Sequence, residues 1–104
     1  MRHLVALLLA IAWPWGAAAT DKTDALGRLY RLDLAISACK GIDVADADQQ
    51  KLDDAIDAAE RASGLDEAAR QKVYDDLESA AEKDPAAFCA SEAPGLATAL
   101  KSLP

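Results

Sequence analysis

The chain carries two cysteines, Cys39 and Cys89, which are 50 residues apart and lie downstream of an N-terminus that resembles an export signal. In an exported protein, a single pair of cysteines predicts one intramolecular disulfide. Such a bond constrains the fold strongly, because two distant segments must meet in the folded chain. We therefore predict that Cys39 and Cys89 form a structural crosslink.

The alternatives for the two cysteines are a redox-active pair or crosslinks between chains. Redox-active thiols usually lie close together in sequence, as in Cys-x-x-Cys, or have basic neighbours that lower the pKa of the thiol. Lys40 adjoins Cys39, but nothing basic adjoins Cys89. The sequence accordingly favours the structural disulfide over a redox centre.

The N-terminus has the three parts of a secretory signal peptide. Arg2 and His3 supply positive charge, residues 4–12 are apolar, and Pro14 precedes small residues that end at Ala19. This pattern predicts cleavage after Ala19 and removal of residues 1–19. A membrane anchor is disfavoured, because the apolar run is shorter than the roughly 20 residues of a spanning helix and contains a proline.

Cleavage would leave residues 20–104, 85 residues in all, as a single domain that is periplasmic or secreted and has no stable membrane insertion. This segment has no histidine, tryptophan or methionine. Because Arg2 is the only one of the 11 basic residues that is removed, 10 basic residues remain against 18 acidic ones, and the formal net charge becomes −8. Nucleic acids and anionic membranes are bound largely through clustered Lys and Arg, so we expect neither as a partner.

The same composition excludes several kinds of catalysis. A domain without histidine cannot hold a Ser-His-Asp or Cys-His arrangement, a histidine-ligated zinc or haem, or a histidine pH switch. The sequence also contains no Gly-x-Gly-x-x-Gly, Gly-x-x-x-x-Gly-Lys or Gly-x-Ser-x-Gly motif. We therefore expect no cofactor and no enzymatic activity. Pairs of carboxylates are the remaining route to catalysis, and an acidic chain contains such pairs by chance.

Apolar residues recur at helical spacing through most of the domain. This periodicity predicts helices over 21–40, from 46 or 48 to 63, over 66–83, from 85 through 89, and from 94 to the C-terminus. No run of alternating β-branched residues indicates a strand. The predicted fold is all-α, a small bundle of four to five short helices stapled by one disulfide. The inward positions of the first three helices are predicted to be Ala25, Leu29, Leu32, Ile36 and Cys39, then Leu52, Ala55, Ile56, Ala59 and Ala62, then Ala69, Val73, Leu77 and Ala80.

Polar residues and glycines mark the predicted helix ends. Gly41 and Gly64 suit the left-handed conformation that commonly follows a helix. Asp46 and Gln49 are three residues apart, and together they resemble a capping box. Asp84 precedes a proline, which is the typical order of an N-cap and a first helical residue.

The densest acidic stretch covers residues 43–60. Asp46, Asp48 and Gln50 match early positions of a calcium-loop template, but Lys51 stands where the template requires glycine. Asp57 also replaces the bidentate glutamate, so a solvated helix face is favoured and no metal site is predicted. The alternative is weak binding of divalent cations, for which the candidate ligands are Asp46, Asp48, Asp53 and Asp57.

Leu34 points away from the predicted inward stripe, and an exposed leucine is the favoured interpretation. An interaction surface on this domain would be an exposed apolar patch. Tyr30 and Tyr74 also lie off the stripes; we expect their rings at the edge of the core with the hydroxyls in water, and a groove between helices is the alternative. The candidates for the apolar patch are Leu34, Leu96, Leu100 and Leu103.

The segment from Asp84 to Cys89 reads Asp-Pro-Ala-Ala-Phe-Cys and follows an alanine-rich amphipathic middle. This pattern, over residues 36–89, resembles a loose group of small exported bacterial proteins whose later cysteine has an Asp-Pro-x-x-Phe/Tyr-Cys setting. The resemblance implies a helical periplasmic domain with one disulfide and implies no activity. In architecture alone, the chain is similar to acid-stress chaperones of the bacterial periplasm, which are small helical proteins with one long-range disulfide.

Three functions remain open at this point. The leading hypothesis is a non-enzymatic module that presents a helical surface to another envelope or exported protein. The second is a conditional chaperone, which would open at low pH when its carboxylates become protonated and would then expose apolar faces. The third is a carboxylate-based enzyme, which would need two acidic groups that converge in an apolar pocket with perturbed pKa values.

Overall fold

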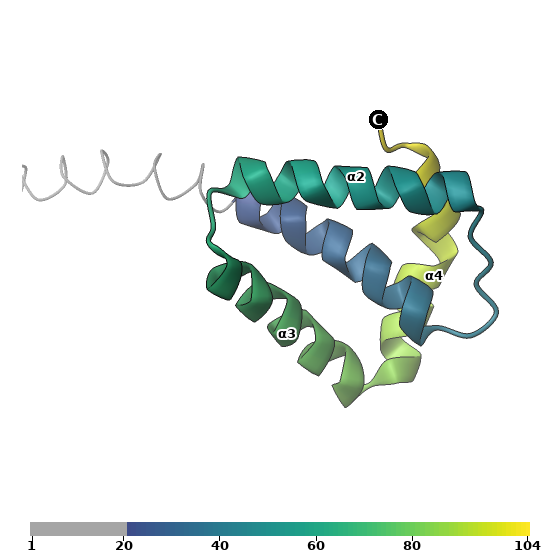
Figure 1. The fold of residues 1–104 in the computed structure, drawn as a ribbon. Helices are drawn as coiled ribbons and strands as arrows, with labels where there is room; N and C mark the ends of the chain where they lie inside the picture. Colours follow the sequence, from purple (N-terminus) through teal and green to yellow (C-terminus); the bar gives the residue numbers. More distant parts are fainter. Residues whose placement is uncertain (1–20) are drawn as a thin grey trace, which may run out of the picture.

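A computed structural model describes residues 21–104, which form four helices and no strand (Figure 1). The first helix covers residues 21–38, and α2, α3 and α4 span Asp46–Ser63, Glu67–Lys83 and Pro85–Lys101. The all-α bundle predicted from the periodicity is confirmed. The predicted signal peptide and its cleavage site lie outside the described residues. Within residues 21–104, no helix has the length and apolar character needed to cross a membrane.

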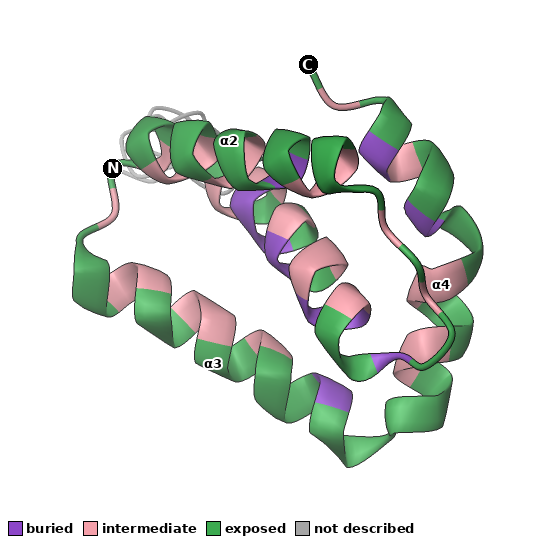
Figure 2. Cartoon of the chain, turned by 45° about the vertical axis from the view of Figure 1, so that its right-hand side comes forward, coloured by how far each residue is buried: buried purple, intermediate pink, exposed green. Residues whose placement is uncertain are grey.

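The first helix is the centre of the fold. Figures 1 and 2 show it between α2 and α3, with α4 crossing near its C-terminal end. It supplies as many of the buried apolar side chains as the other three helices together. Its buried residues are Leu26, Tyr30, Leu34 and Ala35, with Cys39 just beyond its end, whereas the other helices contribute Leu52, Ala81, Leu96 and Leu100.

The first helix is covered on two faces, and this corrects the single inward stripe predicted for it. Leu29, Leu32 and Ile36 of that stripe are only half-buried, and they pack against a cluster formed by α2 and α4. That cluster consists of Leu52, Leu96 and Leu100. Leu26, Tyr30 and Leu34, which lie next to the stripe, are buried instead, because α3 covers that side of the helix.

Most predicted helix ends are confirmed. Gly41 and Gly64 have positive φ values of 78° and 71°, as expected for residues that follow a helix. The carboxylates of Asp66 and Asp84 cap α3 and α4 by accepting backbone N–H groups at 2.8 and 3.1 Å. The prediction of a capping box at Asp46 is wrong. Asp46 is the first helical residue of α2, and the N-cap residue is Ala45, which has no side-chain cap.

The chain ends in one helix where the sequence indicated two. Pro94 was expected to open a separate helix, but it lies inside α4, which continues from Pro85 to Lys101. A proline inside a helix removes one backbone hydrogen bond and strains the preceding turn. Packing compensates, because Leu96 and Leu100 beyond the proline are each 3% exposed and complete the core cluster with Leu52.

Candidate functional site

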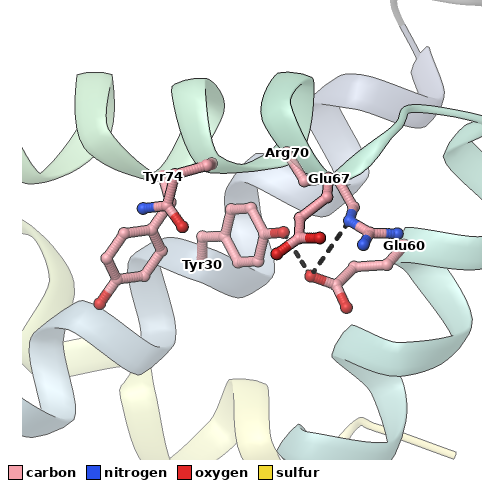
Figure 3. Close-up of a pocket in the computed structure, with 6 residues that line it drawn as sticks. Tyr30, Glu60, Glu67, Arg70 and Tyr74 are labelled. Carbon is pink, nitrogen blue, oxygen red and sulfur yellow. Dashed lines mark hydrogen bonds and ion pairs between the residues drawn. The ribbon is translucent and has the colours of Figure 1, made fainter.

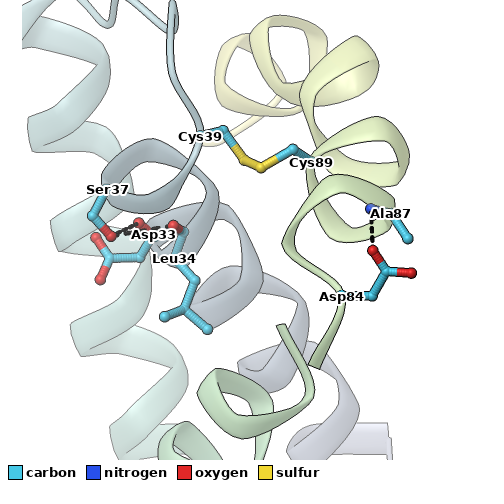
Figure 4. The surroundings of a disulfide bond; sticks show 7 residues. All are labelled: Asp33, Leu34, Ser37, Cys39, Asp84, Ala87 and Cys89. Carbon is cyan, nitrogen blue, oxygen red and sulfur yellow. Dashed lines mark hydrogen bonds between the residues drawn. A yellow bond between two sulfur atoms is a disulfide. The ribbon is translucent and has the colours of Figure 1, made fainter. Parts of the chain in front are cut away.

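The disulfide between Cys39 and Cys89 is present, with the two Cα atoms 5.7 Å apart (Figure 4). It joins the end of the first helix to the beginning of α4, and the loop that it closes contains all of α2 and α3. Cys39 is 8% exposed, so one end of the crosslink is part of the core. The arrangement supports a structural crosslink.

The acidic residues of α2 do not gather into a metal site. Among residues 21–104, no three His, Cys, Asp or Glu side chains are placed so that they could hold one ion. Asp53 instead accepts a hydrogen bond from the side chain of Gln49 at 3.0 Å. The candidate ligands are spread along the outer side of α2, where Asp46, Asp53 and Asp57 are exposed and Asp48 is half-buried.

The prediction that four leucines form an exposed apolar interaction surface is wrong. Leu34, Leu96 and Leu100 are 4%, 3% and 3% exposed, and Leu103 packs half-buried against the core cluster. Leu34 is buried because the first helix is covered on two sides. A patch that includes these leucines therefore does not exist on the folded surface.

Several cavities lie along the seam between the first helix and α3. Only Ala81 of the 17 residues of α3 is buried, and Figure 2 shows the rest of α3 as exposed or intermediate. The cavities lie on both sides of this seam. Residues 67, 70, 71 and 74 lie on one stripe of α3 and line the first side, whereas 73, 77 and 80 line the second.

The tyrosine pocket, on the first side of the seam, has a volume of about 350 Å³ (Figure 3). The hydroxyl of Tyr30 donates a hydrogen bond of 2.6 Å to Oε2 of Glu60 at the end of α2. Nε of Arg70 lies 4.0 Å from the same oxygen, and the ring of Tyr74 meets that of Tyr30 edge to face at 5.4 Å. The pocket therefore joins the first helix, α2 and α3. Its lining residues are Tyr30, Glu60, Glu67, Arg70, Gln71 and Tyr74.

The two tyrosines partly agree with the expectation. Their rings lie at the edge of the core, but Tyr30 is 5% exposed and its hydroxyl is bonded to a carboxylate and not to water alone. Burial raises the pKa of Tyr30, and the hydrogen bond to Glu60 and the charge of Glu60 raise it further. Burial also raises the pKa of Tyr74, together with the charges of Asp33, Glu78 and Asp75. Both phenols are therefore held in the neutral form.

Alkaline pH should loosen the fold through these tyrosines. A phenol whose pKa is raised by folding adds stability below its unfolded pKa of about 10, and this stability is lost as the pH rises above that value. We expect the free energy of unfolding, measured by urea denaturation, to fall as the pH rises above about 10. Tyr30→Phe should reduce this slope. If the free energy of unfolding of Tyr30→Phe falls as steeply with pH as that of the wild type, Tyr30 is not the cause of the alkaline loss of stability.

The arginine groove, on the second side of the seam, consists of two neighbouring cavities of about 430 and 340 Å³ that share the lining residues Arg31 and Leu77. Neither Arg28 nor Arg31 has an ion pair or a hydrogen bond with any part of the chain over residues 21–104. Asp24, Asp84 and Glu92 also line the groove. We define it by two basic and four apolar residues: Arg28, Arg31, Val73, Leu77, Ala80 and Phe88.

Asp33 is a half-buried carboxylate on the first helix. Burial raises its pKa, and the charge of Asp53 on α2 raises it further. No cavity described along the seam is lined by both Asp33 and Asp53. The arrangement therefore does not provide the pair of acidic groups in an apolar pocket that a carboxylate enzyme needs.

The sequence indicated the tyrosine pocket only as an alternative, because a groove between helices was the second interpretation of Tyr30 and Tyr74. It gave no indication of the arginine groove, because no motif in the sequence marks Arg28 and Arg31 as a site. A comparison of the chain with protein-family models, curated proteins and solved structures finds no match.

Proposed function

We propose that the protein is a non-enzymatic interaction module that binds another exported protein through the arginine groove. The observation that carries the proposal is a pair of guanidinium groups that have no partner among residues 21–104 and lie beside apolar side chains, in a protein with a large excess of acidic residues. A long-range disulfide suits a protein that works in an oxidising compartment outside the cytosol.

In the larger cavity of the groove, Arg28 and Arg31 outnumber the single carboxylate of Asp24, and this local positive charge favours an acidic partner. Arg28 and Arg31 are three residues apart and line the same groove, so they offer two guanidinium forks to one bound segment. Val73 and Leu77 are only half-buried and supply apolar contact beside them. We infer that the partner presents a segment with acidic and apolar side chains, such as one face of an amphipathic helix.

The conditional chaperone is less well supported. Because folding raises the pKa of Asp33, ionised Asp33 costs stability, and this cost is relieved as the pH falls through the folded pKa. Asp33 therefore opposes opening in acid. Absence of any suppression of client aggregation at low pH is the expected outcome of a chaperone assay.

Reversing the charges of Arg28 and Arg31 tests the proposed function. The double variant Arg28→Glu/Arg31→Glu should bind the partner at least about tenfold more weakly, since like charges would then face each other across the groove. The matched control is Lys51→Glu/Arg61→Glu, which makes the same change of charge at exposed positions on α2.

The measurement has two steps. Exported proteins that bind the tagged wild type but not the groove variant are identified by mass spectrometry, and the purified partner is then titrated against all three proteins at low and high salt. The wild type and the control should bind alike, and their affinity should fall with salt. A partner that binds the groove variant as tightly as the wild type would rule out the arginine groove.

A further inference from the structure

We propose that the tyrosine pocket is a binding site for a small zwitterion of the α-amino acid class, with its ammonium group on Glu67 and Glu60 and its carboxylate on Arg70. This site lies on the opposite side of the α3 seam from the arginine groove, so the proposal stands independently of the proposed partner. It rests on which charged groups of the pocket have partners and which do not.

The guanidinium group of Arg70 is largely unengaged. Its nearest carboxylate contact is from Nε to Glu60 at 4.0 Å, and no hydrogen bond satisfies its two terminal nitrogens within residues 21–104. Arg70 is also only 32% exposed, so its position is restrained by the surrounding side chains. A guanidinium group in this state offers a fork of donors that matches a carboxylate in both distance and shape.

Two carboxylates in the same pocket have oxygens to spare. Tyr30 and Arg70 both approach Oε2 of Glu60, and Oε1 has no hydrogen bond or ion pair with residues 21–104. Glu67 has no hydrogen bond or ion pair in the described part of the chain, although Arg70 lies three residues ahead on the same helix. Residues at this spacing commonly pair. Figure 3 shows Glu67, Arg70 and Glu60 grouped around the hydroxyl of Tyr30.

The mixture of charges favours a zwitterion over a simple ion. A plain cation would be repelled by Arg70, and a plain anion would be repelled by Glu60 and Glu67 together with the acidic remainder of the protein. A ligand with both charges a few bonds apart satisfies both sets of groups at once. The rings of Tyr30 and Tyr74 provide an apolar wall for its side chain.

The cavity limits the ligand to a small molecule. A volume of about 350 Å³ is near the lower end of the range for ligand sites, which suits a free amino acid better than a larger metabolite. The site is open to water, so we expect modest affinity, with a Kd of about 1 mM for an apolar amino acid.

The two tyrosines of the chain, Tyr30 and Tyr74, both line this pocket, so their ring resonances in NMR spectra report directly on binding. The probes are L-leucine, L-leucinamide and N-acetyl-L-leucine, titrated at about pH 6.5, where α-amino groups are charged. L-leucine keeps both charges, whereas each of the other two lacks one. We expect L-leucine to shift both tyrosine rings and the other two probes to bind at least about tenfold more weakly.

Matched variants separate a ligand site from a structural contact. Arg70→Gln should weaken L-leucine binding about tenfold, whereas Lys72→Gln, the same change at a side chain that is 76% exposed, should leave it unchanged. If Arg70→Gln loses the helical circular dichroism of the wild type, Arg70→Lys replaces it, because lysine keeps the charge but not the fork. Absence of shifts with L-leucine, or equally tight binding of L-leucinamide, would overturn the proposal.

Discussion

Replacing Cys39 and Cys89 together with alanine is expected to lower the free energy of unfolding by about 4 kcal/mol. The disulfide closes a loop of 50 residues that contains α2 and α3, and the loop-entropy model gives this value for a crosslink of that span. The total stability of a small domain is only about 5 kcal/mol or somewhat more, so most of it depends on this bond.

The expected shift in melting temperature is at least about 15 °C, since 1 kcal/mol corresponds to about 4–8 °C in a domain of this size. Thermal and urea denaturation followed by circular dichroism measure both quantities. The reduced wild type is the control, because it keeps both sulfur atoms in place and lacks only the bond. Similar melting curves for the oxidised and the reduced protein would contradict a structural role of the disulfide.

Leu52→Ala should cost about 2–5 kcal/mol. Leu52 is 0% exposed and lies where α2 meets Leu96 and Leu100 of α4, so truncation leaves a cavity that the neighbouring helices fill only in part. Leu103→Ala is the matched control, because it makes the same chemical change at a half-buried position at the edge of this cluster.

The control should lose about 1 kcal/mol or less. Urea denaturation of the two variants and the wild type gives the comparison, provided that the slope of the free energy of unfolding against urea concentration is the same for all three proteins. Equal losses in Leu52→Ala and Leu103→Ala would mean that the cluster around Leu52 is not the main apolar core of the protein.

Local features of the fold were predictable, because they depend on neighbours in sequence. Asp84 caps α4 and Gly64 ends α2 as expected, since a capping carboxylate and a left-handed glycine act within a few residues. The disulfide followed from the expected export of the chain and from the number of cysteines. These features required no knowledge of how the helices pack.

The wrong predictions concern features that depend on how the helices pack against one another. Leu34 looked exposed because a single inward stripe was assumed, whereas α3 covers a second face of the first helix and buries it. Pro94 looked like a helix start because proline disfavours helix interiors, yet burial of Leu96 and Leu100 holds α4 together across it. Periodicity identifies which face of a helix is apolar, but not how many neighbours that helix has.

The candidate site was less predictable still. The tyrosine pocket brings together Tyr30, Glu60 and Arg70 from three helices, and no spacing in the sequence indicates that they meet. The arginine groove brings together residues of the first helix, α3 and α4. Such cavities depend on the relative positions of whole helices.

The most direct test of the account is to map the surface of this protein that its partner covers. Hydrogen exchange of the backbone, measured by mass spectrometry with and without the purified partner, reports this surface. The proposed function predicts new protection confined to residues 24–31 and 73–88, the segments that carry Arg28, Arg31, Val73, Leu77, Ala80 and Phe88 of the arginine groove. It predicts no change in the acidic outer face of α2. Protection of α2 with an unprotected groove would contradict the proposed function.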